Sequence, residues 1–150
     1  MITPSSIHPD TELRDFLQEK ISVLVQGGST EYVKVYGDWE KPTNKIPDDF
    51  IIIMNNGDVG GVGMDTYFAE GNIMVSMYNR LNDDGSVKKN RVEKILDQFD
   101  MLIERLITDN YFYRYEPQRF ITPTTPNVTS GYSITTLNLR WHTKNKESND

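Results

Sequence analysis

The sequence contains no cysteine and only two histidines, so two of the side chains that commonly carry catalysis or bind metals are scarce. The lack of cysteine excludes disulfides, thiolate nucleophiles and cysteine-based zinc sites. His8 and His142 lie near opposite ends of the chain, and neither has candidate metal ligands beside it. Each histidine is therefore interpreted as an ordinary surface or strand residue, and no metal site is predicted.

Long apolar runs are also absent. The longest strictly apolar stretch covers residues 50–54, whereas a helix that spans a bilayer needs about 20 apolar residues. Residues 1–10 contain no basic region followed by an apolar stretch. We therefore expect no secretory signal and take synthesis in a cytoplasm as the default. No contact with a membrane is predicted.

Basic charge is scarce relative to acidic charge. The 150 residues carry a net charge of −6, and 37% of them are hydrophobic and 25% charged, a composition typical of one globular domain. Lys88, Lys89 and Arg91 form the densest basic cluster, but they open a helical pattern that soon turns acidic. Because proteins that bind duplex nucleic acid usually show a basic stripe, specific binding to nucleic acid is not favoured.

Two amphipathic helices and several strands are predicted from the spacing of apolar residues. Apolar residues recur at helical spacing over residues 10–25 and 87–108, and Gly27 and Gly28 are expected to end the first helix. Alternating or continuous apolar patterns predict strands at residues 32–36, 50–54, 66–68, 72–81, 111–115 and 132–142. The predicted fold class is α+β: a mostly antiparallel sheet with two amphipathic helices packed on one face, forming a single domain over residues 1–150.

The remaining segments are expected to lack regular structure. Residues 1–10 are interpreted as an extended lead-in and residues 143–150 as a flexible tail. In the last predicted strand, the apolar residues alternate on even positions at first and on odd positions later, which predicts a bulge near residues 135–136. Trp141 lies on the apolar side of the second half and is therefore expected in the core. Segments rich in proline or glycine, which are often functional or mobile when long, are predicted as loops at residues 40–47, 58–63 and 122–131.

None of the candidate chemical motifs is complete. Residues 57–63 are glycine-rich, but Met64 and Asp65 follow where a phosphate-binding loop needs lysine and serine or threonine. Residues 82–85 lack the alternating carboxylates and the late glutamate of a calcium loop, so they are interpreted as a plain turn. We therefore predict a non-enzymatic protein without catalytic residues, metal ligands or a cofactor.

Three tyrosines alternate along one predicted strand. Tyr111, Tyr113 and Tyr115 place their rings on the same face, since successive side chains of a strand point to opposite sides. One interpretation is a half-buried strand that packs on the second helix. The other is an aromatic interface patch, because tyrosine is enriched where proteins meet. The sequence leaves both alternatives open.

The order of these elements resembles the tail-completion, or tail-terminator, proteins in the neck of long-tailed bacteriophages and related prophages. The resemblance rests on residues 10–25, 50–54 with their glycine-rich continuation, 72–108 and 132–142. In that family a strand of the form I-x-V-x-x-Y-x often ends in an Asp-Gly turn before the long second helix. Here Ile73, Val75 and Tyr78 occupy that pattern, and the turn at residues 82–85 follows. The likeness covers most of the chain in order and length, without an invariant chemical motif.

The resemblance implies a virion protein of the tail or neck, made in the cytoplasm of a host bacterium. It implies a homo-oligomeric ring, typically a hexamer, that stops polymerisation of the tail tube and joins the tube to the head–tail connector. The expected partners are other copies of the chain, the tail tube protein and the connector, while DNA passes through the lumen without specific binding. The net acidic charge of the chain suits such a lumen.

Contacts in such a ring are expected in the long loops and the tyrosine strand. The candidate interface residues are Pro42, Asn44, Gly60, Gly61, Tyr113, Pro123, Thr125 and Pro126. The alternative is that these loops are ordinary solvent loops. Competing interpretations of the whole chain are another head–tail adaptor, a tail-tube subunit, or a small non-catalytic binding domain.

Overall fold

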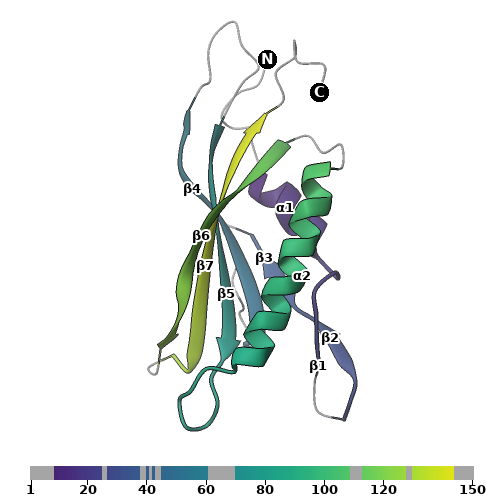
Figure 1. Ribbon diagram of the computed structural model, residues 1–150, viewed down its shortest axis with the longest axis vertical. Helices are drawn as coiled ribbons and strands as arrows, with labels where there is room; N and C mark the ends of the chain where they lie inside the picture. Colours follow the sequence, from purple (N-terminus) through teal and green to yellow (C-terminus); the bar gives the residue numbers. More distant parts are fainter. Residues whose placement is uncertain are drawn as a thin grey trace, which may run out of the picture.

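Helices and strands follow one another in a mixed α+β order (Figure 1). The computed structural model describes residues 9–24, 27–37, 40, 42, 45–60, 70–108, 113–127 and 130–143. In chain order the elements are α1 (Pro9–Leu17), β1 (Ser22–Leu24), β2 (Thr30–Tyr32), β3 (Lys34–Tyr36), β4 (Asp49–Gly60), β5 (Glu70–Arg80), α2 (Lys89–Thr108), β6 (Tyr113–Asn127) and β7 (Tyr132–Thr143).

Five of these strands form one sheet in the order β3-β4-β5-β7-β6. Its neighbouring strands are antiparallel except for β3 and β4, which run parallel. Strands β1 and β2 pair with each other in a separate antiparallel hairpin. Figure 1 shows both helices on the same side of the larger sheet, with the hairpin beside the N-terminal half of α2. The predicted fold class is therefore confirmed.

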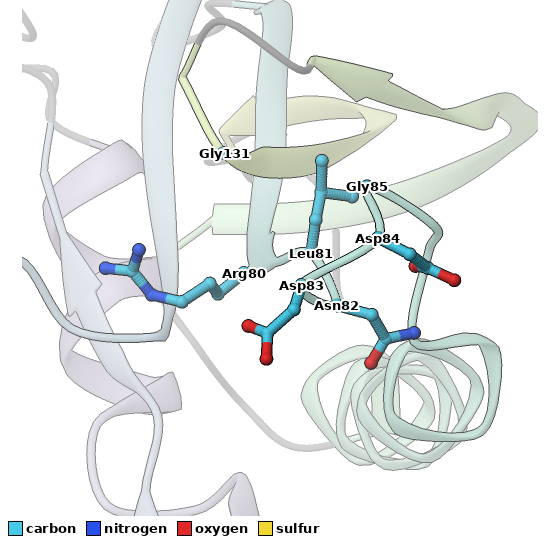
Figure 2. A pocket seen from close by; sticks show the side chains of 7 residues that line it. All are labelled: Arg80, Leu81, Asn82, Asp83, Asp84, Gly85 and Gly131. Atoms are coloured by element: carbon cyan, nitrogen blue, oxygen red, sulfur yellow. The ribbon is translucent and has the colours of Figure 1, made fainter.

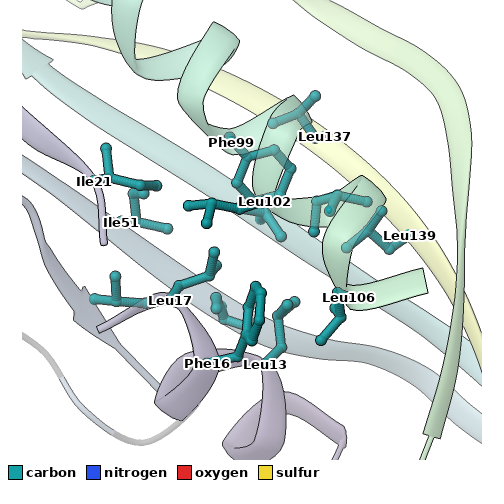
Figure 3. Packing of buried hydrophobic residues seen from close by; sticks show 14 of the residues in the cluster. Leu13, Phe16, Leu17, Ile21, Ile51, Phe99, Leu102, Leu106, Leu137 and Leu139 are labelled. Atoms are coloured by element: carbon teal, nitrogen blue, oxygen red, sulfur yellow. The ribbon is translucent and has the colours of Figure 1, made fainter. Parts of the chain in front are cut away.

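The core lies between the two helices and the sheet. Register across the strands aligns Ile53 with Val75 and Val75 with Leu137, and all three are buried. Figure 3 shows Phe99 of α2 and Leu13 of α1 directed into the space beside the sheet, and both side chains are 2% exposed or less. Burying one such side chain stabilises a fold by about 1.5–3 kcal/mol. The apolar stripe predicted over residues 87–108 is therefore buried against the sheet, as part of α2.

Helix α1 is shorter than predicted. The helix expected over residues 10–25 ends at Leu17, and the chain turns at Glu19, whose φ is 55°. Ile21 and Val23 are buried to 0% and 8% exposure beyond that turn. The apolar spacing of this segment suits a helix, but an extended chain buries both residues and also lets β1 pair with β2. The prediction was wrong because that pairing partner is not part of the local pattern.

The hairpin also changes two neighbouring predictions. Gly27 and Gly28, with φ values of 91° and 80°, lie between β1 and β2 and do not end a helix. The strand predicted over residues 32–36 is divided at Val33, whose N–H donates a hydrogen bond of 2.7 Å to the Ile21 carbonyl. The residues before Val33 belong to the hairpin and those after it to the larger sheet.

Strand β6 is much longer than the tyrosine strand predicted at residues 111–115. It continues through most of the segment that was predicted as a loop over residues 122–131. The strand lies at the edge of the sheet and shifts register at two places along β7. Edge strands tolerate proline, because the outward N–H is not needed in the sheet, and bulges absorb irregular backbone. Proline content alone was therefore a misleading sign of a loop.

Strand β7 carries no bulge of its own near residues 135–136, because the register shift between Thr122–Thr136 and Thr125–Ile134 places its extra residue in β6. The register between β5 and β7 is continuous from Glu70–His142 to Arg80–Tyr132. Ser133 and Thr135 are both 0% exposed and share the parity of Trp141, which is 0% exposed as predicted for a core residue. The buried positions of this half of β7 that share the parity of Trp141 are therefore occupied by small polar residues. The sequence seemed to change parity only because these buried residues are not apolar.

Several other predictions lie wholly or partly outside the residues that the structure describes. The strand predicted at residues 66–68 lies outside them. The glycine-rich segment over residues 58–63 begins as strand, since β4 runs to Gly60. The described part of the lead-in predicted over residues 1–10 belongs to α1, and the first residue of the tail predicted over residues 143–150 belongs to β7.

Candidate interaction surface

The predicted loop residues are distributed over both ends of the sheet. Gly60 ends β4 and pairs with Glu70, whereas Thr125 pairs with Ile134 near the opposite end of β7. The other loop residues are Pro123 and Pro126 on β6, Pro42, which is half-buried, and Asn44 and Gly61, which lie outside the described residues. Their part in an oligomer interface stays a prediction, and those described do not form one continuous surface.

The tyrosine strand contributes to the core. Tyr113 is 5% exposed and Tyr115 is 2% exposed. The ring of Tyr113 meets that of Trp141 edge-on, with 5.5 Å between centroids. The Tyr115 hydroxyl donates to the Pro9 carbonyl at 3.0 Å, and burial raises the pKa of this tyrosine far above its ordinary value. Of the two alternatives, core packing holds for Tyr113 and Tyr115, and Tyr111 lies outside the described residues.

A buried ion pair anchors the end of the sheet where β4 begins. Asp49 is 6% exposed and accepts hydrogen bonds from Asn79 Nδ2 at 2.7 Å and from Arg91 Nε at 2.9 Å. A second nitrogen of the Arg91 guanidinium donates to the Leu24 carbonyl at 2.8 Å. The bond to Asp49 raises the pKa of Arg91 above its ordinary value. This arginine therefore ties α2, β4 and the hairpin together.

The neighbouring carboxylate is held by a different arginine. Asp48 accepts from Arg80 Nε at 2.7 Å, and the same guanidinium lies over the ring of Tyr132, 5.0 Å from its centroid. The Tyr132 hydroxyl donates to the Pro47 carbonyl at 2.7 Å. Asp48 and Asp49 are thus each neutralised by an arginine, so they do not act as a carboxylate pair.

A hollow of about 320 Å³ opens beside this anchor. The hairpin, β3, the segment before β4 and the start of α2 together supply its walls. Its lining residues include Val23, Glu31, Tyr32, Lys34, Lys45 and Ile46. The volume is at the lower end of the range found for small-molecule sites, but the lining is charged and lies on the surface, which suits contact with another macromolecule.

Exposed apolar side chains gather around this hollow. Of the five large apolar side chains exposed in the described residues, two line the hollow, Tyr32 at 60% exposure and Ile46 at 49%. A third, Leu24, is 59% exposed on the same hairpin. Leu24 and Tyr32 point to the same side of the hairpin, because Ser22 pairs with Tyr32 and strand positions two apart share a face. We call Leu24, Tyr32, Lys34, Lys45 and Ile46 the hairpin surface.

Sequence reasoning missed the hairpin surface. The helical spacing of residues 10–25 placed Leu24 in an apolar stripe, whereas the structure exposes it. Ile46 fell in a polar loop segment. A usable signal was the apolar side chain in that loop, next to Pro47 and the two aspartates that follow it.

Helix α2 carries a second exposed surface with the opposite charge. Glu93, Asp97, Asp100 and Glu104 are exposed, and their spacing places them along one face of the helix. The two other exposed apolar side chains are also on α2: Met101 is 68% exposed, and Ile107 45%. Burial and then the charges of Asp97 and Glu104 raise the pKa of Asp100. We call Glu93, Asp97, Asp100, Met101 and Glu104 the acidic helix face.

A second hollow, of about 340 Å³, surrounds the turn between β5 and α2. Figure 2 shows the carboxylates of Asp83 and Asp84 pointing away from each other, so they do not converge on a shared ligand position. Asp84 instead accepts from the Ser86 N–H at 2.9 Å, and the bonds from Ser86 lower the pKa of this carboxyl. Gly85 has a φ of 86°, as a tight turn requires. The turn predicted at residues 82–85 is confirmed.

Among the described residues, no group of histidine, aspartate and glutamate side chains is arranged to hold a metal ion. His142 lies on β7, with its Nε2 3.5 Å from Glu116 Oε1. Neither described helix combines the length and the apolar character needed to cross a lipid bilayer.

The sequence matches no protein-family model, and no curated protein matches it. A function is therefore proposed from the hairpin surface and the acidic helix face.

Proposed function

We propose that this chain is a structural virion protein of the tail or neck, which assembles into a ring that caps the tail tube and joins it to the head–tail connector. The observation that carries the proposal is the pair of exposed surfaces. All five exposed large apolar side chains of the described residues lie on the hairpin surface or on α2. Clustered exposed apolar side chains mark contact surfaces on proteins.

The two surfaces belong to different elements, so a copy that offers one to its neighbour keeps the other free. Contacts between two different patches of identical subunits repeat head-to-tail, and they close into a ring when the rotation allows it. The order and length of the elements, which resemble tail-completion proteins, direct the proposal to the phage neck. The ring is proposed to be a hexamer, to contact the tail tube protein and the connector, and to act without catalysis.

The proposed lumen conducts DNA without binding it specifically. The net charge of −6 favours repulsion between the ring and the phosphate backbone. A basic stripe along one face would instead have favoured retention of DNA.

Electron microscopy of the purified full chain tests the proposal. Discrete rings of uniform diameter are expected. Long tubes would indicate a tail-tube subunit, and small separate particles at every concentration would favour a binding domain. A nitrocellulose-retention assay with double-stranded DNA adds a second reading, in which salt-sensitive tight binding would contradict passage through a passive lumen.

A further inference from the structure

The charges around the hollow are unequal once the internal ion pairs are set aside. Asp48 pairs with Arg80 and Asp49 with Arg91. Lys34, Lys45 and Glu31 remain, and all three are exposed. Within the described part of the chain, neither lysine forms an ion pair. The hairpin surface therefore offers a surplus of positive charge beside the apolar side chains of Tyr32 and Ile46.

The acidic helix face offers the complementary arrangement. None of its four carboxylates forms an ion pair with another described residue, and like charges three or four positions apart on a helix repel one another. Partial burial first, and then the charges of Asp97 and Glu104, raise the pKa of Asp100. Met101 places an exposed apolar side chain beside the carboxylates. Cations from outside the subunit would relieve the repulsion, and a neighbouring apolar surface would cover Met101.

The two surfaces lie on different sides of α2. Arg91 and Gln98 mark the side that contacts the hairpin, since they bond to the carbonyls of Leu24 and Ser22. Glu93, Asp97 and Glu104 lie on another side of the helix by their spacing. One subunit can therefore present both surfaces at once to two different neighbours.

We infer that the acidic helix face of one subunit docks on the hairpin surface of a second copy of this chain. Asp97 and Asp100 then approach Lys34 and Lys45, and Met101 contacts Tyr32 and Ile46 at the hollow. The inference rests on the proposed function for its biological setting, and it adds which surfaces form the contact between ring subunits. Opposite charges give the contact its orientation, while the apolar side chains supply the buried area.

Charge exchange tests the contact. One full-length variant carries Lys34→Glu and Lys45→Glu, and another carries Asp97→Lys and Asp100→Lys. Each variant alone juxtaposes like charges, so its self-association is expected to weaken at least about tenfold. An equimolar mixture of the two is expected to recover assembly, because each altered surface then meets a complementary one. A single chain with all four changes is expected to assemble by itself.

Light scattering coupled to gel filtration measures the mass of each assembly, and circular dichroism checks that each variant is folded. The matched control carries Lys88→Glu and Arg140→Glu, the same change of charge at residues of neither surface, and is expected to assemble like the parent chain. Restoration in the mixture distinguishes a direct contact from a general effect of charge. A variant that fails to fold is replaced by the corresponding lysine-to-glutamine or aspartate-to-asparagine version, for which weakened assembly is still expected.

The outcomes separate this inference from the proposed function. Rings that persist in both charge-reversed variants would overturn the docking contact and leave the ring proposal standing. Open chains or dimers that respond to charge exchange would support the contact and contradict the ring. A parent chain that stays monomeric at the highest concentration reached would overturn both.

Discussion

Gly71 and Trp141 face each other across β5 and β7, and the indole ring occupies the space where a side chain on Gly71 would begin. A β-carbon at Gly71 would lie 2.9 Å from two atoms of that ring, and Trp141 is 0% exposed. This pair extends the core to the end of the sheet. The absence of a side chain at Gly71 leaves space on β5 for the large indole of Trp141 on β7.

Replacing Gly71 with alanine is expected to destabilise the protein by about 1–3 kcal/mol, because the added methyl group overpacks a filled core. Urea denaturation measures the change. Combining Gly71→Ala with Trp141→Phe should cost less than the sum of the two single changes, since the smaller ring leaves room for the methyl group. Strict additivity would contradict the close approach.

Asp49 and Asp48 provide a matched pair for testing the buried anchor. Asp49→Ala leaves the Arg91 guanidinium without its carboxylate and is expected to cost about 3 kcal/mol, the lower end for a broken buried pair, because the Arg91 side chain is 25% exposed. Asp48→Ala breaks a pair whose side chains are 45% and 62% exposed, and is expected to cost less than about 1 kcal/mol. Equal losses in thermal or chemical denaturation would disprove the distinction.

Glu19 tests where the first helix ends. Its φ of 55° lies in the left-handed region, which glycine adopts without steric cost. Glu19→Gly is therefore expected to leave stability unchanged or raise it by up to about 1 kcal/mol. Asp15→Gly removes the same charge inside α1 and is expected to cost a few tenths of a kcal/mol, because glycine is a poorer helix former than aspartate. If both glycines destabilise equally, the helix continues through Glu19, as the sequence alone predicted.

The pair between Arg14 and Glu40 is expected to make stability depend on pH. The hydrogen bond from Arg14 lowers the pKa of Glu40 below its ordinary value of 4.5, and the Gly37 N–H adds to the effect. A carboxyl group whose pKa is lowered by folding stabilises the protein at pH values above its ordinary pKa. This stability is lost as the pH falls through the lowered pKa of the folded state.

Glu40→Gln should therefore be less stable than the parent at pH 7, and the difference should shrink at strongly acidic pH. Urea midpoints at several pH values measure it. In an Arg14→Gln background the same change should have a smaller effect at pH 7. A difference that stays constant over the whole pH range would contradict the ion pair.

Local pattern was sufficient where one element buries one continuous face. The stripe of α2 and the alternation of β5 appear in the sequence and are confirmed, because each follows from its own periodicity. Trp141 was placed in the core by parity within its own strand. The turn at residues 82–85 followed from side chains that bond to the backbone two positions away.

The segments that were misread depend on distant partners. The chain after Leu17 is extended because β2 pairs with β1 and because the core accepts Ile21. Strand β6 continues through its prolines because it needs only β7 on one side. Hydrogen bonds to a remote strand produce no periodic pattern of apolar residues in the segment that makes them. Spacing and composition therefore predicted a longer helix after Leu17 and a loop in the second half of β6.

The sequence by itself determined the layer of two amphipathic helices on a largely antiparallel sheet, since apolar periodicity alone requires each face to be covered. The tertiary structure alone decided which side chains are left at the surface. The hairpin surface joins Leu24, Tyr32 and Ile46 from three segments, and only folding brings them together. Charge and apolar character at a contact site depend on the positions of side chains in space, which their spacing along the chain does not determine.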